Sequence, residues 1–228
     1  MPTYRTVALA LLSFAFSPDS YAQAALGCHV GAAWSGMATA SGANYHSRLV
    51  PSAGLVFEVP VTPSFSLGPE IAYRVRGARE SLTFPQQRNG VIWRFSYTDL
   101  NAMAIIRLGQ NPVRPHFLAG PSFGLLNSAW LLHLRDNNVI RKEWLDPEQM
   151  KLSRVQFSLV AGAGFTFRVG GHRLMVDGRY AHGFTDLMGA AMAYDNNGVV
   201  VRQLSGFERT YSLNLVYLIT IPEAEQPK

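Results

Sequence analysis

The sequence predicts an all-β protein: an eight-stranded antiparallel up-and-down barrel that crosses a membrane with its strands. Hydrophobic residues make up 48% of the chain, yet no stretch beyond the N-terminus approaches the roughly 18 consecutive apolar residues of a membrane-spanning helix. Instead, apolar residues alternate with small or polar ones, and short connections alternate with long ones. These three observations exclude helical spans and indicate strands that are hydrophobic on one face.

Residues 1–24 are predicted to be a signal peptide that is cleaved on export through the Sec pathway. Arg5 precedes an apolar run from Val7 to Phe16, and Ala22-Gln23-Ala24 forms an A-x-A cleavage site. We therefore expect residues 25–222 to form one barrel domain and residues 223–228 to form a short polar tail.

The alternation is clearest near the C-terminus. From Tyr211 to Ile221 the odd positions are apolar, whereas Asn214 and Thr220 between them are polar. Because successive side chains of a strand point to opposite faces, one face is suited to hydrocarbon and the other is small or polar. Eight segments follow this pattern, at approximately 28–37, 53–61, 65–76, 92–108, 115–127, 154–169, 172–185 and 207–221.

One of these segments changes phase. Trp93, Phe95 and Tyr97 occupy odd positions, whereas the apolar residues from Leu100 onward occupy even positions. A β-bulge near residues 98–99 would place both sets on the lipid face.

The connections alternate in length. Residues 62–64, 109–114 and 170–171 form short turns rich in Pro and Gly, and the connections 38–52, 77–91, 128–153 and 186–206 are long. This alternation is typical of an outer-membrane barrel with short periplasmic turns and long external loops.

A soluble sandwich or a lipocalin-like barrel is the alternative, since both also alternate, with the apolar face inside. Lipid outside is favoured because aromatic residues gather toward strand ends, where interfacial girdles lie. These residues are Trp93, Phe95, Tyr97, Phe117, Tyr180, Phe184, Phe207, Tyr211 and Tyr217.

Several segments, in the same order along the chain, resemble the PorT-like outer-membrane β-barrel domain family, related to small OmpA- and OmpX-like barrels. They are Phe65 to Tyr73 followed by Gly77, Leu100 to Arg107, Pro115 to Gly124, Leu159 to Gly164 and Met175 to Gly183. The resemblance implies the same eight-stranded barrel and allows a role as a secretion accessory. Asn101 and Met103 depart from the Glu and Pro of the family pattern.

If odd positions of the last strand face lipid, the alternation assigns a set of charges to the lumen. Buried charges need partners, so we expect a salt-bridged network that plugs a narrow barrel. A selective path or a ligand pocket is the alternative. The network residues are Glu58, Glu70, Arg74, Arg107, Arg168, Asp177 and Arg179, with Arg76 and Arg94 on the same predicted face.

The external loops carry the candidate contact residues. The 128–153 connection is expected to extend the barrel as a hairpin that turns at residues 136–138, and residues 194–198 form a second hairpin tip in preference to a calcium loop. Basic residues here are expected to meet lipopolysaccharide, and the loops offer a surface for a protein partner. The candidates are Trp130, Arg135, Arg141, Lys142, Trp144 and Arg202.

Other chemistry finds little support in the sequence. There is no Gly-x-Ser-x-Gly elbow and no HExxH motif, so we expect no catalytic, metal or cofactor residues. The net charge of +5 is not gathered into one run, which argues against nucleic-acid binding. Cys28 is the single cysteine, and we interpret it as a small apolar strand residue in preference to a lipidated one.

The leading hypothesis is a non-enzymatic outer-membrane barrel with a plugged lumen and with surface loops for structural, adhesive or partner-binding roles. A secretion-accessory or small-solute transport barrel is the second hypothesis. A lipid-modifying enzyme at the barrel rim is the third.

Overall fold

The computed structural model describes residues 23–38, 45–84, 87–136, 138–150, 152–188, 192–194, 200–203 and 206–221. Most of the predicted signal peptide, residues 195–198 of the predicted hairpin tip and the predicted tail at 223–228 lie outside them. Within the described residues, no helix is long and apolar enough to cross a membrane.

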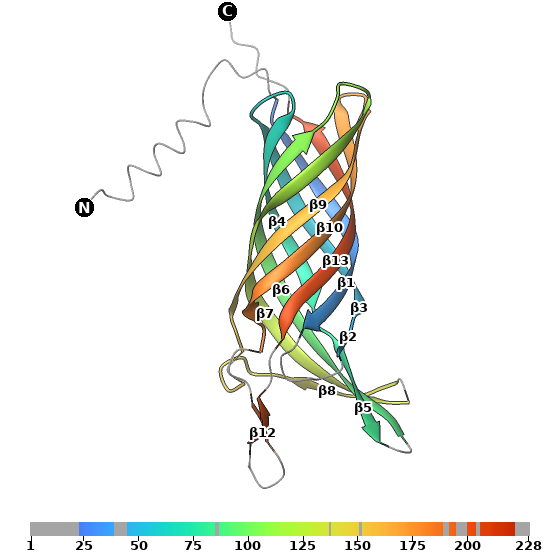
Figure 1. The fold of residues 1–228 in the computed structure, drawn as a ribbon, viewed down its shortest axis with the longest axis vertical. Coiled ribbons are helices and arrows are strands. Elements are labelled where there is room, and N and C mark those ends of the chain that lie inside the picture. Colours follow the sequence, from blue (N-terminus) through green and yellow to red (C-terminus); the bar gives the residue numbers. More distant parts are fainter. Residues whose placement is uncertain are drawn as a thin grey trace, which may run out of the picture.

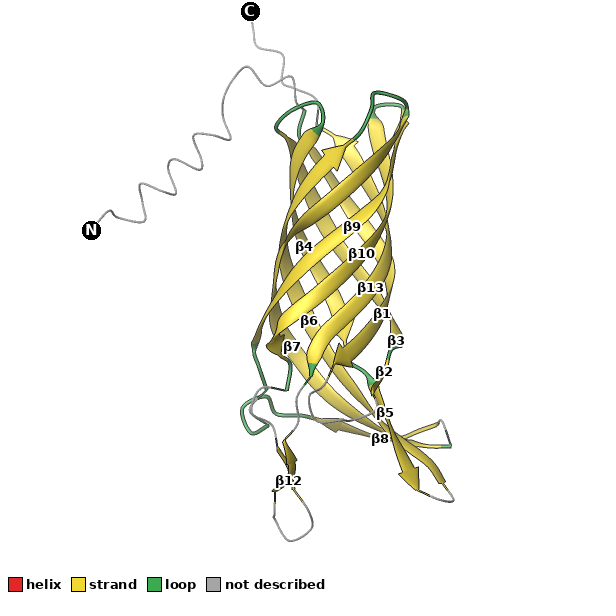
Figure 2. Ribbon diagram, viewed as in Figure 1, coloured by secondary structure: helices red, strands yellow, loops and turns green. Residues whose placement is uncertain are grey.

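Eight strands close into a barrel (Figure 1). Each ring strand pairs antiparallel with the ring strands before and after it in the chain, and the last pairs with the first, so the predicted up-and-down topology is confirmed. Figure 2 shows the tilted wall of strands. The ring consists of β1 (Ala25–Ala38), β3 (Arg48–Pro60), β4 (Phe65–Arg76), β6 (Gln87–Arg107), β7 (Val113–Arg135), β9 (Val155–Val169), β10 (His172–Asp186) and β13 (Phe207–Thr220).

Short turns join the strands at one end of the barrel, which we call the short-turn end. Gly109 and Gly170 have φ values of 75° and 60°, a region that glycine enters without steric cost. In the β3–β4 turn, the backbone N–H of Phe65 donates to Thr62 Oγ1 at 3.0 Å. Gly109 and Gly170, which helped to predict two of these turns, therefore adopt the turn conformations themselves.

The sheet of the ring extends beyond the barrel at the opposite end, which we call the loop end. β6 and β7 are 21 and 23 residues long and continue past the ring as a pair. β5 (Arg79–Phe84) adds to β6, β8 (Asn138–Trp144) adds to β7, and the two-residue β2 (Tyr45–His46) adds to β5. We call these five segments the surface sheet; its β5 and β8 lie at the foot of Figure 1.

The β7–β8 hairpin agrees with the sequence prediction. Asp136 has a φ of 49° at its turn, and Arg135 pairs with Asn138. A separate two-stranded sheet joins β11 (Met192–Tyr194) to β12 (Val200–Gln203), where a second hairpin was predicted.

The two faces of the wall differ as the alternation predicted. Outward side chains along β13 such as Leu213 and Ile219 are exposed, whereas Asn214 and Thr210 on the same strand are buried inside. A soluble barrel would carry the opposite arrangement. The exposed Phe117, Phe184, Tyr211 and Tyr217 also lie outside, as expected of girdle residues.

The predicted phase change in β6 is wrong. Odd positions face inward along the whole described stretch, so Trp93, Phe95 and Tyr97 are buried within the molecule, and Asp99 follows them. The register does shift opposite Ser96 and Tyr97, but the extra residue lies in β7. Arg94 consequently points outward and is exposed, contrary to its assignment to the lumen.

Candidate functional site

The charged side chains inside the barrel form three layers. The layer nearest the short-turn end centres on Glu58, which is fully buried. Arg107 binds both of its oxygens, with Nη1–Oε1 at 2.9 Å and Nη2–Oε2 at 2.6 Å, and Arg173 Nη1 donates to Oε1 at 2.6 Å. Ser66 and Thr166 accept further hydrogen bonds from Arg107.

The middle layer centres on Arg179. Its Nη1 donates to Glu70 Oε2 at 2.8 Å and its Nε donates to Asp177 Oδ1 at 2.6 Å. Asn101 Nδ2 donates to Glu70 at 2.8 Å, and Asn214 Nδ2 donates to Asp177 at 3.1 Å. Each carboxylate of this layer therefore has a charged partner and a neutral one.

The layer nearest the loop end centres on Arg76. Its Nη2 donates to Asp99 Oδ2 and its Nε to Glu208 Oε1, both at 2.8 Å, and its guanidinium lies 4.5 Å from the centre of the Tyr97 ring. Ser158 Oγ donates to Glu208 Oε2 at 2.9 Å. Arg74 joins this layer to the middle one, since it lies 3.5 Å from both Glu70 and Asp99.

The layers leave little free space between them. A cavity of about 10 Å³ lies between the first two, bordered by Glu58, Glu70 and Arg179 among apolar side chains such as Met103. That volume is close to the minimum that holds one water molecule. An open channel through this part of the lumen is incompatible with such packing.

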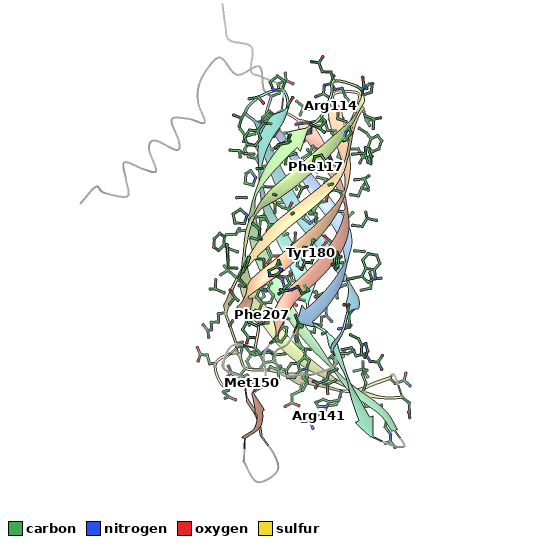
Figure 3. The ribbon with its side chains drawn as sticks, viewed as in Figure 1. Arg114, Phe117, Arg141, Met150, Tyr180 and Phe207 are labelled. Carbon is green, nitrogen blue, oxygen red and sulfur yellow. The ribbon has the colours of Figure 1, made fainter. Side chains whose placement is uncertain are left out.

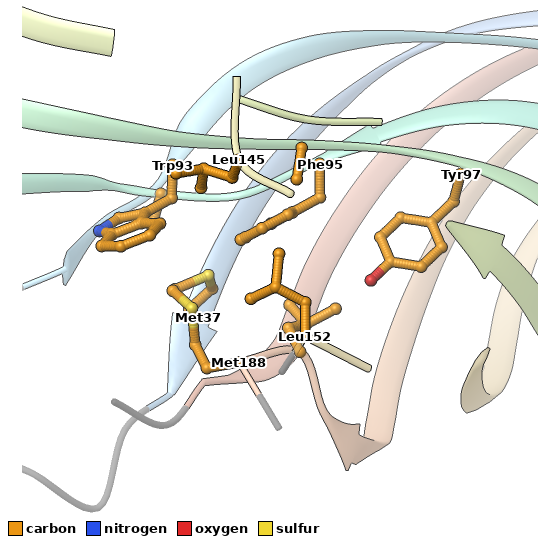
Figure 4. Close-up of a cluster of buried hydrophobic side chains, with 10 residues drawn as sticks. Met37, Trp93, Phe95, Tyr97, Leu145, Leu152 and Met188 are labelled. Carbon is orange, nitrogen blue, oxygen red and sulfur yellow. The ribbon is translucent and has the colours of Figure 1, made fainter. Parts of the chain in front are cut away.

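Apolar side chains cover the lumen at the loop end. Trp93 and Phe95 stack at 6.4 Å, and residues from the loop-end connections pack with them (Figure 4). We call this cluster the lid, because it lies over the Arg76 layer, which its member Tyr97 contacts. It consists of Met37, Ala78, Trp93, Phe95, Tyr97, Ala129, Leu145, Leu152, Leu187 and Met188.

The short-turn end remains open. A cavity of about 670 Å³ lies there, and its wall includes Arg107, Arg114, Arg168 and Arg173. Arg114 is labelled at this end in Figure 3, and Arg141 is labelled at the opposite end. We call this cavity the vestibule.

Six of the seven predicted network residues lie in the three layers: Glu58, Glu70, Arg74, Arg107, Asp177 and Arg179. The seventh, Arg168, lies on the lumen-facing side of β9 but is exposed in the vestibule wall. The sequence reasoning missed Asp99, Arg173 and Glu208. The alternation of β10 and β13 also assigns Arg173 and Glu208 to the lumen face and could have predicted them. The β-bulge predicted near residues 98–99 left the direction of Asp99 unassigned.

Five of the six predicted loop residues lie on the surface sheet. Arg135, Arg141, Lys142 and Trp144 are exposed, and Trp130 is half-buried against a small apolar cluster of Ile92, Leu132 and Leu134. Arg141 Nη2 lies 3.6 Å from Glu143. Arg202 lies in β12, outside the surface sheet.

Reactive groups show little clustering. Cys28 lies on the outer face of β1, opposite Tyr217 and Leu55, as expected of a strand residue. His182 lies beside Tyr180, with Nδ1 3.3 Å from its hydroxyl. Among the described residues, no group of three His, Cys, Asp or Glu side chains is arranged to hold a metal ion.

Comparison with known proteins identifies a family. The sequence model of the outer membrane protein beta-barrel domain matches residues 20–189. No curated protein matches the chain.

Three solved structures illustrate the similarity. Neisserial surface protein A is 14% identical over 86% of this chain and 97% of its own, with a TM-score of 0.46. Ail of Yersinia pestis is 14% identical over 86% and 99%, with a TM-score of 0.41. The outer membrane enzyme PagL is 15% identical over 85% and 99%, with a TM-score of 0.36.

Proposed function

Since the chain belongs to the outer membrane protein beta-barrel domain family, we propose that it is a non-enzymatic barrel whose surface sheet binds a partner outside the cell. The barrel lies in the bacterial outer membrane, and its short turns face the periplasm in the arrangement general to such barrels. The observation that carries the proposal is the continuation of β6 and β7 beyond the ring, with β5 and β8 added at their sides.

The strand β8 is the part of this sheet best suited to binding. It pairs with β7 on one side, and no strand among the described residues pairs with its other side. An unpaired edge offers backbone N–H and C=O groups to an extended segment of a partner. Val139 and Ile140 are 46% and 63% exposed on it, and Trp144 is 55% exposed, so apolar contact area is also available.

The charge of β8 favours an anionic partner. Arg141 and Lys142 are exposed on it, and Arg135 is exposed beside its turn. Lipopolysaccharide and anionic polysaccharides at cell surfaces both carry suitable groups. The same exposed surface of β8 also suits structural and adhesive roles.

The lumen contributes stability in this proposal. The three charged layers join strands across the barrel, and the lid packs against the layer of Arg76 through Tyr97. Passage of solutes is not part of the function.

The test uses the purified barrel in lipid nanodiscs, with immobilised heparin and lipopolysaccharide micelles as polyanionic probes. Arg141→Glu is compared with Arg154→Glu, because both arginines lie near the loop end, are exposed, and have one carboxylate neighbour. We expect Arg141→Glu to weaken binding severalfold and Arg154→Glu to leave it unchanged. Equal effects of the two substitutions would contradict the proposal.

Two further measurements address the other hypotheses. Discrete, sizeable conductance steps in planar bilayers would favour transport over binding. Hydrolysis of phospholipid by the purified barrel would favour a lipid-modifying enzyme.

A secretion-accessory role is the second candidate. The resemblance to PorT-like barrels supports it, and so does the open vestibule on the periplasmic side, where secreted cargo passes. Loss of cargo secretion on deletion of the gene, with adhesion retained, would favour this candidate.

A further inference from the structure

We propose that the vestibule is a binding site for a phosphate-type oxyanion, provided by a free phosphorylated solute or by a phospholipid headgroup at the periplasmic surface. The cavity holds about 670 Å³ and opens at the short-turn end, away from the surface sheet. It therefore provides a function independent of partner binding outside the cell.

The charges of the wall have one sign. Arg107, Arg114, Arg168 and Arg173 line the vestibule, and its described lining contains no Asp or Glu. Glu58 lies behind the wall, fully buried, and its oxygens are already bound by Arg107 and Arg173. Four arginines against one carboxylate leave an excess of three positive charges, which favours a multivalent anion.

Arg114 and Arg168 are the arginines free to bind such an anion. Arg114 Nε donates to the backbone carbonyl of Asn111 at 3.3 Å, which leaves the other guanidinium N–H groups available. Among the described residues, neither arginine lies in an ion pair with a carboxylate. Arg168 is also exposed to the cavity.

The strand register brings like charges together. Arg168 of β9 lies directly opposite Arg173 of β10, and Arg114 of β7 lies opposite Thr166, two residues from Arg168. Like charges on opposed strand positions are destabilising, and an anion between them would remove the repulsion.

Guanidinium groups suit phosphate in geometry as well as charge. Each presents a planar pair of N–H donors that match two oxygens of a phosphate, and these charge-assisted hydrogen bonds are among the strong ones in proteins.

The vestibule is closed at its inner end. Arg107 is held there by Glu58, Ser66 and Thr166, and the cavity beyond that layer is only about 10 Å³. An anion that enters from the periplasm therefore stops at this layer. This geometry suits a site that binds an anion and does not suit a passage for the anion through the barrel.

The experiment measures anion binding by the purified full chain in micelles of an uncharged detergent. One arm titrates inorganic phosphate and pyrophosphate by calorimetry at constant ionic strength, and the other titrates dioctanoyl phosphatidic acid. The variant is Arg114→Gln/Arg168→Gln. The matched control is Arg154→Glu, which lowers the net charge by the same two units at an exposed position near the loop end, outside both proposed binding surfaces.

We expect the vestibule variant to lose about tenfold or more in affinity, because it removes two guanidinium groups that would each form charge-assisted hydrogen bonds to the anion. The control should bind like the unaltered protein. Binding of the inorganic anions assigns the site to a free solute, and binding of phosphatidic acid alone assigns it to a lipid headgroup.

Two results would overturn the proposal: no binding of any probe to the unaltered protein, or equal binding by the unaltered protein and the vestibule variant. A loss of folding is distinguished by thermal unfolding without anion. There the vestibule variant should be at least as stable as the unaltered protein, because repulsion within the wall is relieved.

Discussion

Arginines on the same inner face of the barrel play different parts at different depths. Arg179 is buried in the middle layer and is bound by Glu70 and Asp177, whereas Arg168 on the neighbouring strand is exposed in the vestibule. A buried charge requires partners, whereas a charge at the mouth of the barrel is solvated by water and is therefore available to a ligand. Depth along the lumen therefore separates structural arginines from arginines available for binding.

Removal of a buried carboxylate is expected to have the largest effect on stability. Glu70→Leu leaves Arg179 and Arg74 without one of their partners, so we expect a loss of about 3–5 kcal/mol in the free energy of unfolding. Urea unfolding in lipid vesicles measures it. The control is Glu148→Gln, which breaks the exposed pair with Arg154 and should cost about 0–1 kcal/mol. Similar losses for both variants would remove the distinction between deep and exposed charges.

A substitution in the lid tests whether the charged layers close the lumen without an intact lid. Leu187 is 1% exposed, so Leu187→Ala should cost about 2–5 kcal/mol through lost contacts and a new cavity. Conductance in planar bilayers should remain absent, because the three layers are intact. Ile140→Ala on the exposed β8 is the control for stability. The appearance of channels in Leu187→Ala would assign closure to the lid.

The outer wall provides a third contrast. Leu213 lies at the middle of β13 and is 55% exposed on the face assigned to lipid. Leu213→Arg should cost about 2–4 kcal/mol in vesicles, because a cation at the bilayer midplane is poorly solvated. Ile140→Arg, on the surface sheet, should change stability little. Equal tolerance at both positions would argue that Leu213 does not face hydrocarbon.

The smallest effect is expected in the vestibule. Arg168→Gln removes a solvated charge without a carboxylate partner among the described residues, so stability should change by no more than about 0.5 kcal/mol. The same unfolding measurement in low salt gives the sign of this change in stability. Relief of the repulsion between Arg168 and Arg173 predicts slight stabilisation. A large loss would show that Arg168 belongs with the structural arginines.

Much of the barrel could be predicted because local chemistry determines it. The alternation around Asn214, the Pro and Gly residues of the turns and the length of the strands all act within a few residues. The position of Asp177 and Arg179 inside the barrel followed from the same alternation, since one lumen-facing residue fixes the others of its strand.

The error in β6 has a physical cause. Trp93, Phe95 and Tyr97 are apolar enough for the lipid face, and no property of that segment distinguishes lipid from another buried surface. Leu145, Leu152, Leu187 and Met188 cover them from connections far away in the sequence. Only the folded chain brings these residues together.

The sequence by itself therefore determined the strands, their order, the apolar outer face and most of the lumen charges. The tertiary structure decided which carboxylate meets which arginine, that the lid closes one end, and that four arginines share an open vestibule at the other. Alternation and turn chemistry depend on neighbours in the chain, whereas pairing, closure and cavities depend on distances between residues that the chain keeps far apart.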